Sequence, residues 1–191
     1  MSLGLAAALL GELWLGRHIR IGQGGLQVAV GLPLPAHELT GSVVRLLLQE
    51  QSNFELSSWL AYLARTSYER VTQRMAATGH IQRRRRHLVG SAWLPTDTKQ
   101  ALAPLLLLRQ KLRLGHPLVC YELALAGLMS ASGLQDVLLY GASEQDTLRD
   151  RLGEWLRWSD MPPALGELLS CTRAAVGREA MTGRAAITSR T

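Results

Sequence analysis

The chain has 191 residues, enough for one domain that buries about 70% of the surface exposed by its unfolded chain. Its hydrophobic residues, 47% of the total, are mainly Leu and Ala with a single Phe, and this composition favours helix over sheet. No stretch is long and apolar enough for a membrane-spanning helix. The formal net charge of +6 comes from basic residues that are nearly all Arg, which favours phosphate-bearing partners such as nucleic acid or anionic lipid.

The N-terminal segment predicts a buried helix followed by a hairpin. Residues 2–16 are apolar almost throughout, and we interpret them as a helix because Glu12 interrupts the run and no basic segment of a signal peptide precedes it. Residues 17–21 and 26–30 alternate polar and apolar around the glycines of GQGG, as the strands of a β-hairpin do. The prolines of GLPLP end this pattern.

Three amphipathic helices are predicted before the next glycine. Apolar residues recur at helical spacing over residues 37–50, 55–65 and 67–78. Gly79 then stands where a left-handed residue commonly ends a helix. Tyr68 shares the apolar face of the third helix, so we interpret it as a core residue.

The stretch GHIQRRRRHLVGSAWLP, residues 79–95, predicts a second hairpin. Its first strand contains Arg83, Arg84, Arg85 and Arg86. Because these side chains alternate between the two faces of a strand, neither face can pack on an apolar core without burying charge, and the hairpin should protrude into solvent. The return strand is apolar and contains Leu88, Val89 and Trp93. We expect this limb to contact a second subunit.

The second half of the chain predicts further helices. Residues 96–115 begin with capping residues and contain Pro104, which removes one hydrogen bond and is expected to kink the helix. Residues 117–131 are apolar on nearly every side and are the candidate for a central, fully surrounded helix. Shorter helices follow at 134–140, 143–158 and 162–180. We therefore expect a mostly α fold, a single helical domain over residues 1–180 around this central helix, with a disordered tail over 181–191.

Residues with catalytic or metal-binding chemistry are scattered. Cys120 and Cys171 lie in apolar helical patterns and are interpreted as reduced core thiols. His80 and His87 flank the arginine run without a third metal ligand, and no serine stands in a nucleophile motif. We expect no metal site, no cofactor and no enzymatic activity.

Basic residues on the helix before the second hairpin extend the charged surface. They are Arg65, Arg70 and Arg74. Any one of them could be an ordinary solvated arginine paired with Glu55 or Glu69. Together with the four hairpin arginines, however, they form a candidate surface for anionic lipid head groups.

The order of these elements resembles the Golgi phosphoprotein 3 family. The matching stretches are GLAAALLGELWLGRHI, LPLPAHELTGSVVRLLLQE, WLAYLARTSYERVTQRMAATGHI with the arginine hairpin after it, and YELALAGLMSASGLQDVLL, over about residues 3–158. The resemblance implies a helical fold with a hairpin used in self-association, and peripheral membrane binding through a phosphatidylinositol 4-phosphate pocket. In eukaryotes such proteins also hold glycosyltransferases in the Golgi by their cytoplasmic tails, so a protein partner is implied.

The family's pocket carries over at one position. Its arginine pair, three residues apart on the helix before the hairpin, corresponds to Arg65 and Tyr68, and a third arginine in the first helix corresponds to Ala6. A tryptophan of the family's pocket falls before Met1. We therefore expect binding to phosphoinositide-type head groups without strong selectivity among anionic lipids.

The resulting expectation is a non-enzymatic, cytoplasmic protein that binds anionic phospholipid membranes peripherally, forms a homo-oligomer through its hairpin and tethers a protein partner. One alternative is a winged-helix DNA-binding regulator, since helix, helix, basic hairpin is also that module's order and wing arginines contact DNA phosphates. The further helices, which a winged-helix domain does not need, favour the membrane interpretation.

Overall fold

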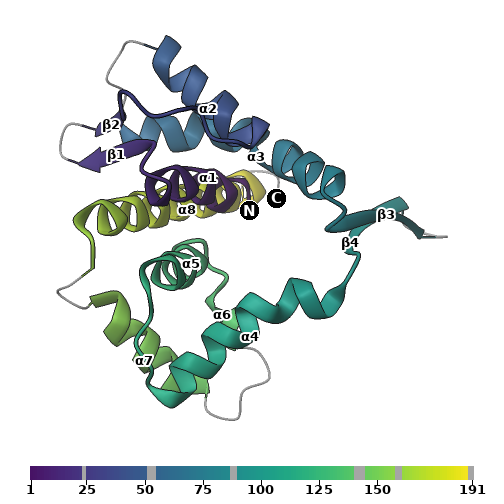
Figure 1. Cartoon of the computed structure of the whole chain (residues 1–191). Helices are drawn as coiled ribbons and strands as arrows, with labels where there is room; N and C mark the ends of the chain where they lie inside the picture. The colour runs from purple at the N-terminus through teal and green to yellow at the C-terminus, as the bar shows by residue number, and fades with distance from the viewer. Residues whose placement is uncertain (23–24, 51–54, 87–89, 140–144, 158–160, 189–191) are drawn as a thin grey trace.

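The structure, a computed structural model, describes residues 1–22, 25–50, 55–86, 90–139, 145–157 and 161–188. These residues form eight helices and two antiparallel hairpins (Figure 1), so the mostly α fold with one protruding, arginine-rich hairpin is confirmed. Among the described helices, none combines the length and the apolar character needed to cross a membrane.

The first part of the chain packs around its N-terminal helix. Its elements are α1 (Ser2–Leu15), β1 (Ile19–Gly22), β2 (Gly25–Val28), α2 (Glu38–Gln49) and α3 (Leu56–Ala77). Leucines and alanines cover most sides of α1, which is buried along most of its length and contacts α3, α5 and α8. The strands β1 and β2 pair in antiparallel register, with Ile19 opposite Val28. The predicted buried helix and first hairpin are confirmed.

The helix α3 is continuous where two helices, over 55–65 and 67–78, were predicted, so the boundary at residue 66 is wrong. Ser67, a polar residue beside that boundary, is 1% exposed. Its hydroxyl donates a hydrogen bond to the carbonyl oxygen of Ser2 in α1 (2.8 Å). This tertiary contact gives a partner to the hydroxyl that is buried where α3 packs on α1.

The arginine hairpin extends directly from the end of α3. It consists of β3 (Ile81–Arg86) and β4 (Gly90–Pro95), and it leads into α4 (Thr98–Leu114). Asp97 caps α4, because its carboxylate accepts hydrogen bonds from the backbone N–H groups of Lys99 (2.8 Å) and Gln100 (3.1 Å). The helix continues through Pro104.

Four helices follow α4. They are α5 (Cys120–Ala131), α6 (Gln135–Leu139), α7 (Gln145–Arg157) and α8 (Pro163–Thr188), and α8 extends past the predicted helix end at residue 180. α5 contacts α1 and α8 on one side and α6 and α7 on the other, so it is central, as predicted. It is not fully surrounded, because Cys120 and Tyr121 in its first turn are exposed.

Candidate functional site

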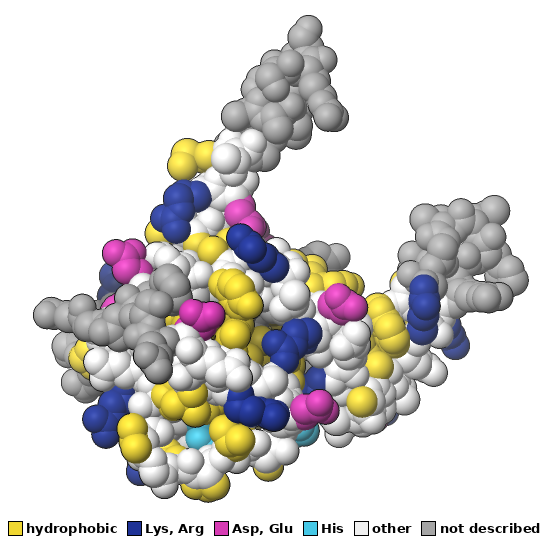
Figure 2. Space-filling view, turned by 90° about the horizontal axis from the view of Figure 1, so that it is seen from above, with side chains coloured by type: hydrophobic (Ala, Val, Ile, Leu, Met, Phe, Trp, Pro, Cys, Tyr) yellow, Lys and Arg dark blue, Asp and Glu magenta, His cyan; other side chains and the backbone are white. Residues whose placement is uncertain are grey.

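The β3–β4 hairpin presents charge on both of its faces. In its register Arg83 lies opposite Trp93 and Arg84 lies opposite Ala92. Because directly opposed residues share a face, Arg83 and Trp93 lie on one face and Arg84 lies on the other. Both arginines are exposed and Trp93 is 40% exposed. The described part of the hairpin stands clear of the helical body, as Figures 1 and 2 show, which confirms the expected protrusion.

Part of the predicted hairpin site lies outside the described residues. Arg85 and Arg86 belong to β3, where they pair with Ser91 and Gly90, but their side chains lie outside the described residues. Leu88 and Val89 lie wholly outside the described residues. Trp93 is therefore the one described member of the predicted oligomerisation limb.

The structure brings two of the three predicted α3 arginines together. Arg70 and Arg74 are four residues apart and so lie on the same face of α3, next to α1 and α2. Arg65 is exposed on a different side of the helix, nearly opposite Arg74. Basic and acidic side chains are also intermixed over this part of the molecule in Figure 2. The three arginines do not form a continuous basic stripe.

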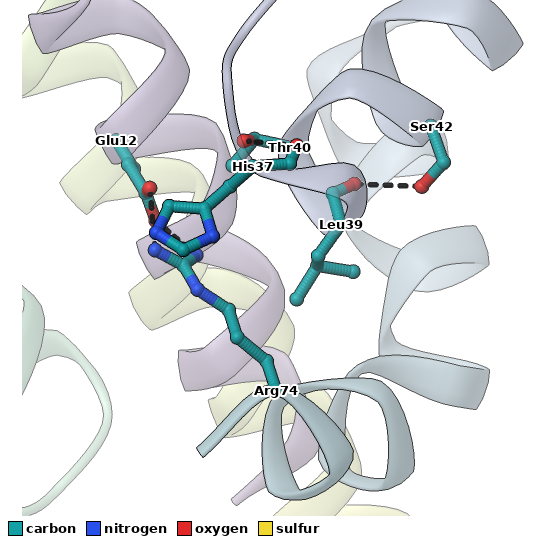
Figure 3. A network of polar contacts seen from close by, with 6 residues as sticks. All are labelled: Glu12, His37, Leu39, Thr40, Ser42 and Arg74. Carbon is teal, nitrogen blue, oxygen red and sulfur yellow. Dashed lines mark hydrogen bonds and ion pairs between the residues drawn. The ribbon is translucent and has the colours of Figure 1, made fainter. Parts of the chain in front are cut away.

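Arg74 forms an ion pair with Glu12 of α1. The guanidinium donates to both carboxylate oxygens, from Nη1 at 2.9 Å and from Nη2 at 3.0 Å. The two side chains are 26% and 45% exposed, so the pair lies at the surface. His37, at the start of α2, lies beside them in Figure 3. The sequence predicts Glu55 or Glu69 as the partner of an arginine on this helix, and for Arg74 this prediction is wrong.

Arg70 forms a hydrogen bond with an uncharged partner, the hydroxyl of Ser42 in α2. It has no ion pair with any residue that the structure describes, so the predicted pairing with Glu55 or Glu69 is wrong for Arg70 as well. Arg70 lines a surface hollow of about 330 Å³, together with Glu38, Gln73 and Arg74. A second hollow of about 300 Å³ adjoins it and shares His37, Arg74 and Thr78 with it. Of the two neighbouring arginines, Arg74 is therefore paired with a carboxylate and Arg70 is not.

The first hollow also lies at the N-terminus of α2, which has no side-chain cap. The hydroxyl of Thr40 donates to the carbonyl of His37 (3.1 Å), and that of Ser42 donates to the carbonyl of Leu39 (2.7 Å), as Figure 3 shows. Both hydroxyls therefore bind carbonyl oxygens instead of the free N–H groups of the first turn. These N–H groups add positive potential next to Arg70. Glu38, in the same turn and at the same hollow, offsets part of it.

The three positions matched to the family's pocket by resemblance lie in different environments. Arg65 and Tyr68 are both exposed, and Tyr68, at 49%, is not the core residue that was predicted. Its neighbour Ser67 takes the buried position against α1 instead. Ala6, the third position, is completely buried in the core.

Neither cysteine is part of a disulfide. Cys120 is exposed, so its assignment as a core thiol is wrong, whereas Cys171 is partly buried. Burial raises the pKa of the Cys171 thiol, with partial compensation from the charge of Arg178. Within the described ranges, no group of three or more His, Cys, Asp or Glu side chains is arranged to hold a metal ion.

Comparison with known proteins identifies the family of this chain. No curated protein matches it. A family model described as Golgi phosphoprotein 3 (GPP34) matches residues 1–172, which is most of the chain and includes both hairpins and α1 to α7. The chain therefore belongs to the Golgi phosphoprotein 3 (GPP34) family.

Proposed function

We propose that this protein binds anionic phospholipid membranes peripherally, through the β3–β4 hairpin and Arg70. The observation that carries the proposal is the protruding hairpin, with Arg83 and Arg84 on opposite faces and Trp93 exposed beside Arg83. Guanidinium groups bind phosphate bidentately, and tryptophan favours the boundary between water and hydrocarbon. This set of side chains suits a surface of lipid head groups better than the protein's own core.

Arg70 is the best candidate for contact with a single head group. It lies in a hollow, lacks an acidic partner among the described residues and adjoins the uncapped start of α2. Arg74, in contrast, is compensated by Glu12. Because only Arg65 remains of the family's own pocket, we expect little preference for phosphatidylinositol 4-phosphate over other lipids of equal charge.

A flotation assay tests the membrane proposal. Phosphatidylcholine vesicles would contain either phosphatidylserine or phosphatidylinositol 4-phosphate, matched in surface charge. Replacing Arg83 and Arg84 by Gln should weaken binding by up to about 1 kcal/mol per residue, with a steep salt dependence. The matched control replaces Arg173 and Arg178, two exposed arginines of α8, by Gln, and should bind nearly as the parent does.

Three results would contradict the proposal. One is a parent protein that fails to float with any anionic vesicle. Another is a control variant that loses as much binding as the hairpin variant, since the effect would then reflect net charge alone. A third is a titration in which duplex DNA binds more tightly than the vesicles, which would favour the winged-helix alternative.

We also propose that the hairpin contributes to a homo-oligomer, which would tether a partner protein at the membrane. Support comes from exposed apolar side chains on α4, the helix that follows the hairpin. There Leu102, Leu106 and Leu107 are 43%, 52% and 45% exposed. A second copy of the chain could cover this surface.

Light scattering would compare the parent with a variant in which residues 82–92 are replaced by a short turn containing glycine. The parent should have the larger mass. Equal masses would exclude this role for the hairpin.

A further inference from the structure

The β1–β2 hairpin lies at the end of α3 opposite the β3–β4 hairpin (Figure 1). A second surface with both basic and apolar side chains is found there. We call it the β1–β2 face, and it consists of Arg17, Arg20, Val30 and Leu32, with the exposed Leu34 two residues further along the chain. A hollow of about 630 Å³ lies within it, lined by the two arginines and by Trp14, Ile19, Val30 and Leu32 among others. No sequence pattern had marked these residues as a site.

The apolar part of the β1–β2 face projects into solvent. Val30 is 97% exposed, almost as much as in an unfolded chain, and Leu32 and Leu34 are 48% and 49% exposed. The prolines that follow each leucine, Pro33 and Pro35, restrict the backbone of this segment. Fewer backbone conformations are therefore open to this segment, so less conformational entropy is lost when it binds.

Arg17 has a backbone conformation that an arginine normally avoids. Its φ is 62°, the left-handed region, where it ends α1. Its N–H donates to the carbonyl of Trp14 (2.9 Å), and the N–H of His18 donates to the carbonyl of Leu13 (2.9 Å). A residue in this position is usually glycine.

The available glycine stands one residue earlier. Gly16 has an ordinary φ of −74°, and a Cβ at this position would lie 3.0 Å from Cδ2 of the His18 ring and 3.3 Å from the carbonyl oxygen of Glu12. There is thus little room for a side chain at residue 16, which favours glycine there, and Arg17 is the residue that adopts the left-handed conformation. Strained residues of this kind are concentrated at functional sites.

The charge on the β1–β2 face is uncompensated. Within the part of the chain that the structure describes, neither Arg17 nor Arg20 makes a side-chain hydrogen bond or an ion pair, and no acidic side chain lines the hollow between them. An occupant that complements this face must combine negative charge with an apolar region.

We propose that the β1–β2 face is a second contact with anionic phospholipid membranes, in which Arg17 and Arg20 bind lipid phosphates and Val30, Leu32 and Leu34 enter the interface. The proposal rests on the membrane function proposed above. A bilayer supplies both required properties, negative charge at its surface and hydrocarbon below it. Juxtaposed arginines and exposed aliphatic side chains are the combination that interfacial binding segments use.

Labels at single cysteines test the two contacts separately. In a background with Cys120 and Cys171 replaced by Ser, an environment-sensitive fluorophore is placed at Leu32→Cys, at Trp93→Cys or at Gln110→Cys. Vesicles contain phosphatidylcholine and phosphatidylserine, with and without brominated lipid as quencher. The label at position 32 should shift to shorter wavelength and be quenched by brominated lipid. The label at position 110, on the exposed side of α4, should do neither.

The outcomes at these labels separate this inference from the proposed function. A shift at position 93 without one at position 32 overturns the second contact and leaves the hairpin contact in place. A shift at position 32 alone supports the second contact and contradicts the role of the hairpin. A protein that does not float, with neither label shifted, contradicts both.

Substitution of Arg17 distinguishes binding from stability. Arg17→Gly should raise the melting temperature, because glycine adopts the left-handed conformation without strain, yet it should weaken vesicle binding about fivefold. Arg17→Lys, the matched control, should keep most of the binding. If Arg17→Gly bound vesicles as strongly as the parent, the role of this arginine would be overturned. If binding is weaker although the melting temperature is higher, unfolding cannot be the cause of the weaker binding.

Discussion

Glu12 of α1 and Arg74 of α3, 62 residues apart in sequence, form a bidentate ion pair. It joins the two helices beside the hollow that contains Arg70. The pair has two consequences. It ties α3, and so the base of the arginine hairpin, to the core helix α1. It also compensates the charge of Arg74, which leaves Arg70 as the more available cation of this surface.

Removing the carboxylate from this pair should increase membrane binding. Glu12→Gln leaves Arg74 uncompensated, so binding to anionic vesicles should strengthen, while the free energy of unfolding falls by only about 0.5 kcal/mol because Glu12 is 45% exposed. Flotation and urea denaturation measure the two effects. Glu154→Gln, at an exposed site of α7, makes the same change in net charge. Equal gains in binding for both variants would contradict the local role of Arg74.

The buried ion pair of Lys111 and Glu122 should matter more for stability. The Glu122 side chain is 5% exposed and accepts hydrogen bonds from Nζ of Lys111 (2.8 Å) and from the backbone N–H of Val119 (2.9 Å). Lys111→Met would leave a buried carboxylate without its cation and should lower the free energy of unfolding by about 3 kcal/mol, as measured in urea. Lys99→Met, at an exposed site of α4, should change it little. Equal effects of the two would refute this prediction.

The same pair predicts a pH dependence. Burial alone would raise the pKa of Glu122, but the hydrogen bonds from Lys111 and Val119 and the charge of Lys111 hold it below its ordinary value of 4.5. Because the folded-state pKa is depressed, this contribution to stability is present above pH 4.5 and is lost as the pH falls through the lower folded value. The deficit of Lys111→Met relative to the parent should shrink over that acidic range. Denaturation curves at several pH values would show it, and a constant deficit would argue against the assignment.

Two helix glycines should respond in opposite directions to alanine. At Gly127 in α5, a Cβ would lie 2.5 Å from Cδ1 of Leu169 and 3.3 Å from Cδ2 of Leu156, so Gly127→Ala should destabilise the fold by about 1–3 kcal/mol. At Gly177 in α8, no atom lies within 4 Å of the added Cβ, and Gly177→Ala should stabilise the helix by about 0.5–1 kcal/mol. Thermal unfolding of both variants measures the contrast. Similar melting temperatures would show that α5 and α8 are not packed as described.

The two thiols should react at different rates. Cys120 is exposed, whereas Cys171 is partly buried and its pKa is raised, so less of it is thiolate near pH 8. Alkylation should therefore show a fast phase and a second phase slower by about tenfold or more. Cys120→Ser should remove the fast phase only. A single rate for the parent would contradict the burial of Cys171.

Features that depend on local pattern could be predicted from the sequence. The apolar character of α1 and α5 identified both as interior helices, because a helix that is apolar on most sides requires neighbours on most sides. The protrusion of the arginine hairpin was likewise predictable, since Arg83 and Arg84 fall on opposite faces of any strand that contains them. No tertiary information is needed for either conclusion.

The composition of each surface was decided by the tertiary structure. Ser67 and Tyr68 are neighbours, about 100° apart around α3, so the rotation of this helix against α1 determines which of them is buried. The spacing of Leu56, Leu60 and Leu63, continued by one turn, reaches Ser67, and this signal is visible only when α3 is taken as one helix. No such signal exists for the pairing of Arg74 with Glu12, for the lack of an acidic partner of Arg70 among the described residues, or for the left-handed backbone of Arg17. They arise from the packing of helices distant in sequence and from the room available around Gly16, which local periodicity does not encode.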